Sequence, residues 1–421
     1  MTMELRIESE TAPLEAVVLH SPGAEIEAMT PTSARELLYN DIVPLTIVRR
    51  DHGEFKRVLS QVATVYELRD LARSALEDST LRTGFCAEIA AEDALIAEDL
   101  LRRSPEEIVA AVVEGIPLRR DSLQAFLSDH TYARPPLPNL YFMRDSAAVL
   151  RSGYVTGAMA HPVRAPESLL LSLALKSLVR PDTPHLFAGS ARAREGALLE
   201  GGDLLVLDRN TLLVGLSSRT NAAAIDLLVQ ALIDRFQEPI TTIAVPLSRE
   251  RHAIHLDMLF TMIDRDCALL YGPDMVGENP LPVVTMQSDP ARAPVFTRHP
   301  SLLRCLESLG RKMETVLCGG RDTVRGQREQ WLSGTNALAL APGKIVVYDC
   351  NEATLEELNR AGFSVYSSQE IPGDRDATGV LTGAGRVAIT IPGAELARGG
   401  GGPRCMSLPL RRRTGSTASL A

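Results

Sequence analysis

The 421-residue sequence is poor in aromatic side chains, which make up 4% of it, and it has a single tryptophan. It contains no run of 18 apolar residues, so no membrane-spanning helix is expected. Residues 1–22 are acidic and lack the apolar segment typical of a signal peptide, which favours a cytoplasmic location. The net charge of −9 argues against the basic face that nucleic-acid binding requires.

Cysteine and histidine are scarce and scattered. The six cysteines form no C-x-x-C pair, and a chain of this length needs no disulfides to hold its core. The eight histidines include no H-E-x-x-H motif. His252 and His255 lie in a segment that reads as a strand, where residues three apart face opposite sides. We therefore expect a reducing compartment, no bound metal and no cofactor.

One pattern recurs along the chain: an apolar run, a short polar turn and a second apolar run, as in a β-hairpin. It predicts hairpins in residues 144–159, 201–220, 255–272 and 335–351, and a weaker one in residues 16–29. Helical patterns occur between them, over residues 166–180, 221–237 and 351–362. The last apolar run, 405–410, could complete the N-terminal unit. About five such units favour an α/β fold with radial repetition around one centre.

Residues 68–130 break this pattern, because only helical signals occur there. The clearest helix has Ser104 as its N-cap, Pro105 at its first position, Glu107 completing a capping box and Gly115 at its end. We expect a helical insertion within a single catalytic domain of residues 1–421. Residues 412–421 are polar and are expected to form a disordered tail.

Polar side chains precede strands at equivalent positions of the expected repeat: Asn139, Asp145, Glu200, Asp203, His255, Asp257 and Cys405. Each residue alone has an ordinary explanation, as a turn residue or a small core residue. In a radial repeat, however, these strand ends converge on the centre. A thiolate is a strong nucleophile, a histidine shuttles protons, and carboxylates suit a planar cation with several N–H donors. The set indicates attack on a guanidinium carbon, whereas hydrolysis of a neutral amide would need an oxyanion hole.

Five stretches, in order along the chain, carry a resemblance to bacterial arginine deiminases: PNLYFMRD (138–145), EGGD (200–203), HLDMLFTMID (255–264), TNALALAPGKIVVYDCNE (335–352) and RCMSLPL (404–410). The similarity extends upstream to residues 17–31 and to LLYNDIVP (37–44), and so covers nearly the whole chain. This family belongs to the guanidine-modifying, or amidinotransferase, superfamily. The resemblance implies a five-bladed, pseudo-symmetric ββαβ propeller with an inserted helical bundle.

The resemblance also implies a reaction, the hydrolysis of L-arginine to L-citrulline and ammonia in arginine catabolism. Cys405 would attack the guanidinium carbon and form a covalent thiouronium intermediate. His255 would protonate the departing ammonia and then activate a water. Asp145 and Asp257 would hold the guanidinium nitrogens, and Glu200 would orient His255.

Further residues are implied at the other end of the substrate: Asn139, Arg164 and Arg219, with Asp203 in a supporting role. The glycines of residues 399–402 would belong to a loop that closes over the substrate, because glycine lets the backbone approach closely. Some relatives place an arginine five residues before the cysteine, where this chain has Gly400. Arg398 or Arg404 could replace it.

Several alternatives share the same residues. Hydrolysis of agmatine or of a methylated arginine, and amidino transfer, would use the same cysteine, histidine and carboxylates. An inactive propeller used for binding is another alternative, against which the intact Cys405, His255, Asp145 and Asp257 argue. A thiol peptidase is a weaker one. The resemblance implies a small-molecule substrate and water as partners, no nucleic acid or membrane, and a homo-oligomer, either a dimer or a tetramer.

Overall fold

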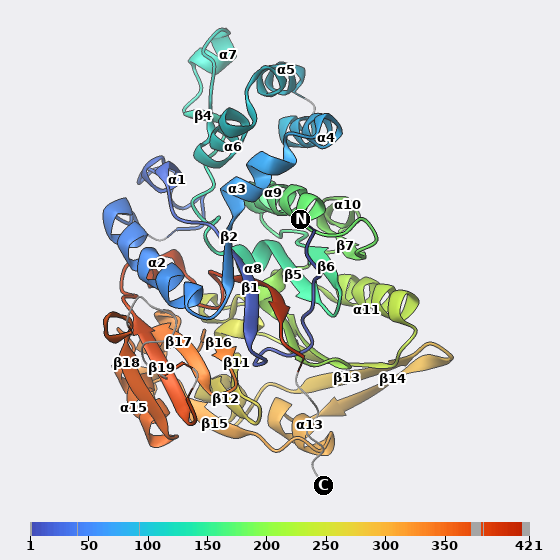
Figure 1. Ribbon diagram of the computed structural model, residues 1–421, viewed down its shortest axis with the longest axis vertical. Helices are drawn as coiled ribbons and strands as arrows, with labels where there is room; N and C mark the ends of the chain where they lie inside the picture. Colours follow the sequence, from blue (N-terminus) through green and yellow to red (C-terminus); the bar gives the residue numbers. More distant parts are fainter. Residues whose placement is uncertain (1, 40, 92, 372–379, 382, 415–421) are drawn as a thin grey trace.

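The computed structural model describes residues 2–39, 41–91, 93–371, 380–381 and 383–414. Within these residues the strands form five sheets of at least three strands each, and one small two-stranded sheet (Figure 1). One of the larger sheets contains β1 (Leu14–Leu19), β2 (Thr64–Glu67) and β20 (Leu408–Arg412). A second contains β5 (Ala147–Leu150), β6 (Gly153–Thr156) and β7 (His185–Ala188).

The other three larger sheets come from residues 204–391, and the strands of two of them alternate along the chain. One has five strands: β8 (Leu204–Asp208), β9 (Thr211–Leu216), β10 (Ile240–Pro246), β13 (Val283–Asp289) and β14 (Arg292–His299). The next contains β11 (Phe260–Asp264), β12 (Cys267–Leu270) and β15 (Glu314–Leu317). The last contains β16 (Leu338–Ala341), β17 (Lys344–Tyr348), β18 (Phe363–Ser367) and β19 (Arg386–Ile391).

These five sheets share one pairing scheme. In each, two antiparallel strands are followed by a third strand parallel to the second: β5–β6–β7, β8–β9–β10, β11–β12–β15, β16–β17–β19 and β20–β1–β2. A parallel neighbour requires a crossover, and helices supply it. These helices are α2 (Leu45–Ser60), α9 (Ala165–Leu178), α11 (Ala222–Phe236), α13 (Leu302–Ser308) and α15 (Glu352–Arg360). The four stronger predicted hairpins and the three predicted helices are therefore present.

Tight turns close the four hairpins. Leu150 pairs with Gly153 across a two-residue turn in which Arg151 has a φ of 53°, as the twist of adjoining strands favours. Asp208 pairs with Thr211, Asp264 with Cys267, and Ala341 with Lys344 in the same way. In each of these hairpins the chain therefore passes from the first strand to the second within two residues. The first strand thus has the same place in the pairing scheme of each of these four sheets.

Three expectations from the sequence are wrong. Residues 16–29 form no hairpin, because β1 ends at Leu19 and α1 (Ala24–Glu27) follows, while β20 supplies the antiparallel partner of β1. The stretch before β11 is no strand but two 3-10 helices, η3 (Arg251–Ala253) and η4 (Leu256–Met258). The expected tail begins too early, since Arg412 is buried at the end of β20. Residues 415–421 of that tail lie outside the described residues.

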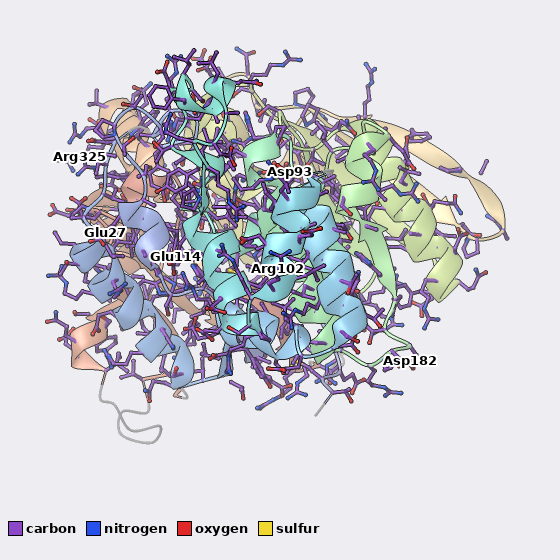
Figure 2. The ribbon with its side chains drawn as sticks, turned by 90° about the horizontal axis from the view of Figure 1, so that it is seen from above. Glu27, Asp93, Arg102, Glu114, Asp182 and Arg325 are labelled. Carbon is purple, nitrogen blue, oxygen red and sulfur yellow. The ribbon has the colours of Figure 1, made fainter. Side chains whose placement is uncertain are left out.

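Helices fill the segment expected to be an insertion. They are α3 (Leu68–Ala75), α4 (Ser79–Ala90), α5 (Ala94–Arg102), α6 (Pro105–Glu114) and α7 (Leu123–Phe126). Helix α6 has the predicted capping box between Ser104 and Glu107. Strands β3 (Ile116–Pro117) and β4 (Tyr132–Arg134) join its end. Figure 1 shows α4 to α7 above the sheets, and Figure 2 shows them from above, with Asp93 and Arg102 labelled at the ends of α5.

The remaining helices are short or lie between sheets: α8 (Met143–Ser146), α10 (Gly189–Arg194), α12 (Gly272–Met275) and α14 (Thr323–Trp331), with the 3-10 turns η1 (Pro162–Arg164), η2 (Gly201–Asp203), η5 (Ser368–Glu370) and η6 (Ala397–Gly399). Three of these, α8, η2 and η6, lie before first strands, as does η4: α8 precedes β5, η2 precedes β8, η4 precedes β11 and η6 precedes β20. Among the described residues, no helix is both long enough and apolar enough to cross a lipid bilayer.

Candidate active site

Cys405 lies just before β20, inside the fold. Its side chain is buried, and its backbone N–H donates to Asn336 Oδ1 at 3.0 Å. Its Sγ is 3.6 Å from Asp257 Oδ2. Asn336, which precedes β16, also donates to the carbonyl of Asp257. The thiol and the carboxylate therefore come from different sheets and are fixed against each other by one asparagine.

His255 lies between two carboxylates. Its Nε2 is 2.8 Å from Glu200 Oε2 and its Nδ1 is 3.4 Å from Asp145 Oδ1. Burial disfavours the imidazolium, but the charge of Asp145, the hydrogen bond to Glu200 and the charge of Asp203 outweigh it, and the pKa of His255 rises to about 9. The ring therefore carries a proton at neutral pH.

The two aspartates that flank the thiol are held by buried arginines. Arg164 donates to Asp145 Oδ2 at 2.7 Å and also binds Glu167. Arg404 donates to Asp257 Oδ2 at 2.8 Å. In both aspartates the other oxygen, Oδ1, is buried and receives no hydrogen bond from the described residues. A buried carboxylate oxygen without a donor is costly, so each Oδ1 is suited to an N–H donor from a ligand.

A cavity of about 260 Å³ opens beside these groups. Its lining includes Cys405, His255 and Asp145 together with four arginines, Arg35, Arg164, Arg219 and Arg251; the other lining residues are Leu38, Tyr39, Asn139, Phe142, Ile254, Gly399, Gly400 and Gly401. The four arginines make the wall basic, and Asp145, with Asp257 beside Sγ, supplies carboxylates near the thiol. A molecule with a cation at one end and an anion at the other matches this distribution of charge.

The thiol is not ionised by its surroundings alone. Burial, followed by the charges of Asp257 and Asp145, raises the pKa of Cys405 well above its usual range. A cation bound between the two aspartates would neutralise the charges that oppose the thiolate. The geometry therefore couples ionisation of the nucleophile to the arrival of a cationic ligand.

The glycine run before Cys405 is packed too tightly for side chains. A Cβ on Gly401 would lie 2.6 Å from the Phe142 ring and 3.0 Å from Cys405 Cβ. Gly400 has a φ of +93°, which is a left-handed conformation that favours glycine. The run is therefore a backbone segment that forms part of the cavity wall and not a spacer.

Two predicted substrate residues lie away from the cavity. Arg398 forms ion pairs with Glu395 and Asp41 and is not part of the cavity lining. Asp203 accepts from the backbone N–H of Leu256 at 2.9 Å and from Ser217 at 2.6 Å, so it supports the turn that carries His255. Burial raises the pKa of Asp203 to about 7. These two contact neither the thiol nor the cavity, because their partners hold them behind it.

The other predicted residues do meet at the cavity or next to it. Asn139 lines it and donates to the carbonyl of Leu37 at 2.7 Å. Arg219 lines it and binds Glu200 Oε2 at 3.3 Å. Burial is outweighed by the charge of Arg219 and the interactions with His255, so the pKa of Glu200 falls to about 2. Arg219 and Arg164 are thus both engaged with carboxylates of the site.

Sequence reasoning missed a buried charge network behind Asp257. Arg404 links Asp257 to Glu10, with which it makes two hydrogen bonds of 3.1 Å. Burial opposes ionisation of Glu10, but Arg404 and Arg144 lower its pKa to about 2. Arg404 was considered only as a substrate ligand, and no local pattern links it to Glu10, which lies 394 residues earlier. Asn336 and Arg251 were missed too.

A metal ion is geometrically conceivable at one place. Asp145, Glu200 and His255 each place a ligand atom within 4.8 Å of the others. Both carboxylates are already paired with an arginine, and His255 carries a proton at neutral pH. A metal requires deprotonated ligands, so these residues do not fit a cation site well.

Solved structures of other proteins share this fold. A dimethylarginine dimethylaminohydrolase, solved as an adduct with S-methyl-L-thiocitrulline, aligns with a TM-score of 0.51 and 11% identity over 94% of this chain and 99% of its own. The N-terminal domain of the cyanobacterial arginine dihydrolase ArgZ aligns with a TM-score of 0.51 and 12% identity over 94% and 97%. The chain therefore has the mixed α/β fold of these proteins.

Sequence comparison assigns the family. The family model for arginine deiminase matches residues 35–412. An arginine deiminase of Listeria monocytogenes serotype 4a (strain HCC23) is 32% identical over 429 residues, covering 98% of each chain. One of Bacillus cereus (strain ATCC 10987 / NRS 248) is 32% identical over 435 residues, covering 98% of this chain and 100% of its own. The chain belongs to the arginine deiminase family.

Proposed function

We propose that this protein hydrolyses L-arginine to L-citrulline and ammonia. Full-length similarity to arginine deiminases supports this reaction. The observation that carries it is the cavity itself, whose lining includes the Cys405 thiol, Asp145 and four arginines, with Asp257 3.6 Å from the thiol. The guanidinium of arginine fits between Asp145 and Asp257, and its carboxylate fits against the basic wall.

The first half of the reaction begins when the substrate cation enters. Its N–H groups donate to the Oδ1 atoms of Asp145 and Asp257, and its charge lowers the pKa of the Cys405 thiol, whose proton passes to solvent. The thiolate adds to the guanidinium carbon. Protonated His255 then gives its proton to one nitrogen, the C–N bond breaks, and ammonia leaves. The carbon remains bound to Sγ as a thiouronium cation.

The second half uses the same histidine as a base. Neutral His255 takes a proton from water, and the resulting hydroxide adds to the thiouronium carbon. The adduct expels the Cys405 thiolate and passes its hydroxyl proton to solvent, which leaves the ureido group of citrulline. Glu200 keeps the ring oriented and favours its protonated form in both halves. Arg164 and Arg404 act as positioning residues, because they hold the two aspartates.

At the far end of the substrate we assign binding to Asn139, Arg164 and Arg219, which line the cavity. Asp203 and Arg398 are left out of this group, and Gly400 contributes backbone only. All three assigned side chains already bind protein groups, and each of the two arginines is paired with a carboxylate that offsets its charge.

A coupled assay tests the function. Purified protein is given L-arginine or agmatine, and ureido product and ammonia are measured, with Cys405→Ala alongside. We expect equal amounts of citrulline and ammonia from arginine and none from the variant. If the wild type releases no citrulline, the proposal fails. Product from agmatine alone would instead indicate a relative that does not read the carboxylate.

Three further points complete the proposal. The repeated pairing scheme of the five larger sheets supports a five-bladed propeller with the site at its centre. The helices of residues 68–130 would be an insertion into that single domain. A cytoplasmic location and a dimer or tetramer stay predictions; the six cysteines are free thiols, which is consistent with a reducing compartment.

A further inference from the structure

The cavity wall formed by the glycine run offers no side chain to a substrate. Residues 399–401 line the cavity as bare backbone, and Arg398 just before them is paired with Glu395 and Asp41 on the outside. Whatever recognises a charged group on this side must come from another segment.

Arg251 is the side chain that reaches this place. A Cβ atom added to Gly400 would lie 3.5 Å from Arg251 Nη2. Among the described residues beyond its chain neighbours, this Cβ would have no other heavy atom within 4 Å. The guanidinium of Arg251 lies over the ring of Trp331, with 5.4 Å between the guanidinium carbon and the ring centroid. Arg251 is the first residue of η3 and lies four residues before His255 in the sequence. The segment that carries the histidine therefore also fixes the backbone position of Arg251.

The local charge favours an anion between Arg251 and its neighbour. Burial, and then the charge of Arg219, lower the pKa of Arg251, as expected for two guanidinium groups that share a partly desolvated wall. An anion placed between them relieves this repulsion. Of the other arginines on the wall, Arg219 is bound to Glu200, Arg164 is buried against Asp145 and Glu167, and Arg35 is exposed at the surface.

We propose that Arg251 binds the carboxylate of the substrate across Gly400 and so makes the enzyme specific for arginine over a decarboxylated guanidine. This inference rests on the proposed function. A guanidinium presents two parallel N–H donors to a carboxylate, and the stacked ring of Trp331 limits the directions in which those donors point.

Steady-state kinetics of Arg251→Gln with L-arginine and with agmatine test the assignment. We expect KM for L-arginine to rise about 10- to 100-fold, as for loss of one charge-assisted hydrogen-bonded pair, with kcat changed only a few-fold. Activity with agmatine, which lacks the carboxylate, should stay at the wild-type level. Arg251→Lys should recover part of the loss, because it keeps the charge but not the fork of donors.

Two controls make the outcome specific. Arg249→Gln removes an exposed arginine two residues away and should leave KM unchanged. Arg35→Gln removes the exposed arginine of the cavity mouth, and a larger effect there than in Arg251→Gln would overturn the assignment. Equal losses with arginine and agmatine would also overturn it, since they would indicate a structural defect.

Calorimetry on Cys405→Ala separates this inference from the proposed function. That variant should bind L-arginine more tightly than agmatine without turning either over, and adding Arg251→Gln should remove the difference. A wild-type chain that makes no citrulline refutes the proposed function alone. A difference in affinity that persists after Arg251→Gln, or no difference at the start, refutes the role of Arg251.

Discussion

Replacing Glu200 with glutamine separates the proton affinity of His255 from its position. The amide keeps the size and one acceptor of the carboxylate, but it removes the charge that lies 2.8 Å from Nε2. A hydrogen bond to a charged group is worth about 1.5–3 kcal/mol, and one pH unit of pKa corresponds to about 1.4 kcal/mol. The pKa of His255 should therefore fall by roughly one to two units in Glu200→Gln.

The consequence for catalysis follows from the first half of the reaction, in which His255 must be protonated. At saturating L-arginine, kcat declines on the basic side as the ring loses its proton, and this limb should move to lower pH by about one to two units in the variant. The assay is kcat against pH for the wild type, Glu200→Gln and the exposed control Glu195→Gln. A basic limb at the same pH in all three would refute the assignment of Glu200 as the group that sets the charge of His255.

Three further predictions concern packing, pH and the buried network. In Gly202→Ala the added methyl would lie 2.7 Å from His255 Cγ and 3.0 Å from Asp145 Oδ1, so kcat/KM should fall about 100-fold while the far-ultraviolet circular dichroism spectrum is unchanged. The fold raises the pKa of His255 from 6.5 to about 9, so protonation of His255 contributes about 3 kcal/mol to the free energy of unfolding below pH 6.5, and this contribution is lost as the pH rises through 9. Urea unfolding at pH 6 and at pH 10 should show this loss in the wild type. The variant His255→Gln should not show it. Glu10→Gln leaves the buried charge of Arg404 partly uncompensated and should cost about 3–5 kcal/mol in urea unfolding, and an unchanged midpoint would contradict the network.

Much of the fold could be predicted because its signals are local. A hairpin such as β8–β9 is specified by two apolar runs and the turn between them, and α6 is specified by Ser104, Glu107 and Gly115. The same reasoning failed at residues 16–29. There the antiparallel partner of β1 is β20, almost four hundred residues later. The expectation that the last apolar run completes the N-terminal unit is therefore confirmed, whereas the hairpin expected within residues 16–29 is wrong.

The site divides in the same way. Asp145, His255 and Cys405 could be proposed because each lies shortly before a strand, and the repeat places those strand ends together. Glu10 could not be proposed from the sequence, because it is linked to Asp257 only through Arg404, which lies 394 residues away from Glu10 in the chain. Arg398 was misplaced for a related reason: its partners Glu395 and Asp41 draw it outward, and a surface ion pair leaves no pattern in a single sequence.

The central claim is that Cys405 carries a covalent intermediate derived from arginine. The most direct measurement is intact-protein and peptide mass spectrometry after acid quenching of a single turnover with L-arginine. The account expects an adduct with the mass of arginine less ammonia on the peptide that contains Cys405, and neither adduct nor citrulline from Cys405→Ala. Citrulline produced at the wild-type rate by Cys405→Ala, with no adduct on the wild type, would contradict it.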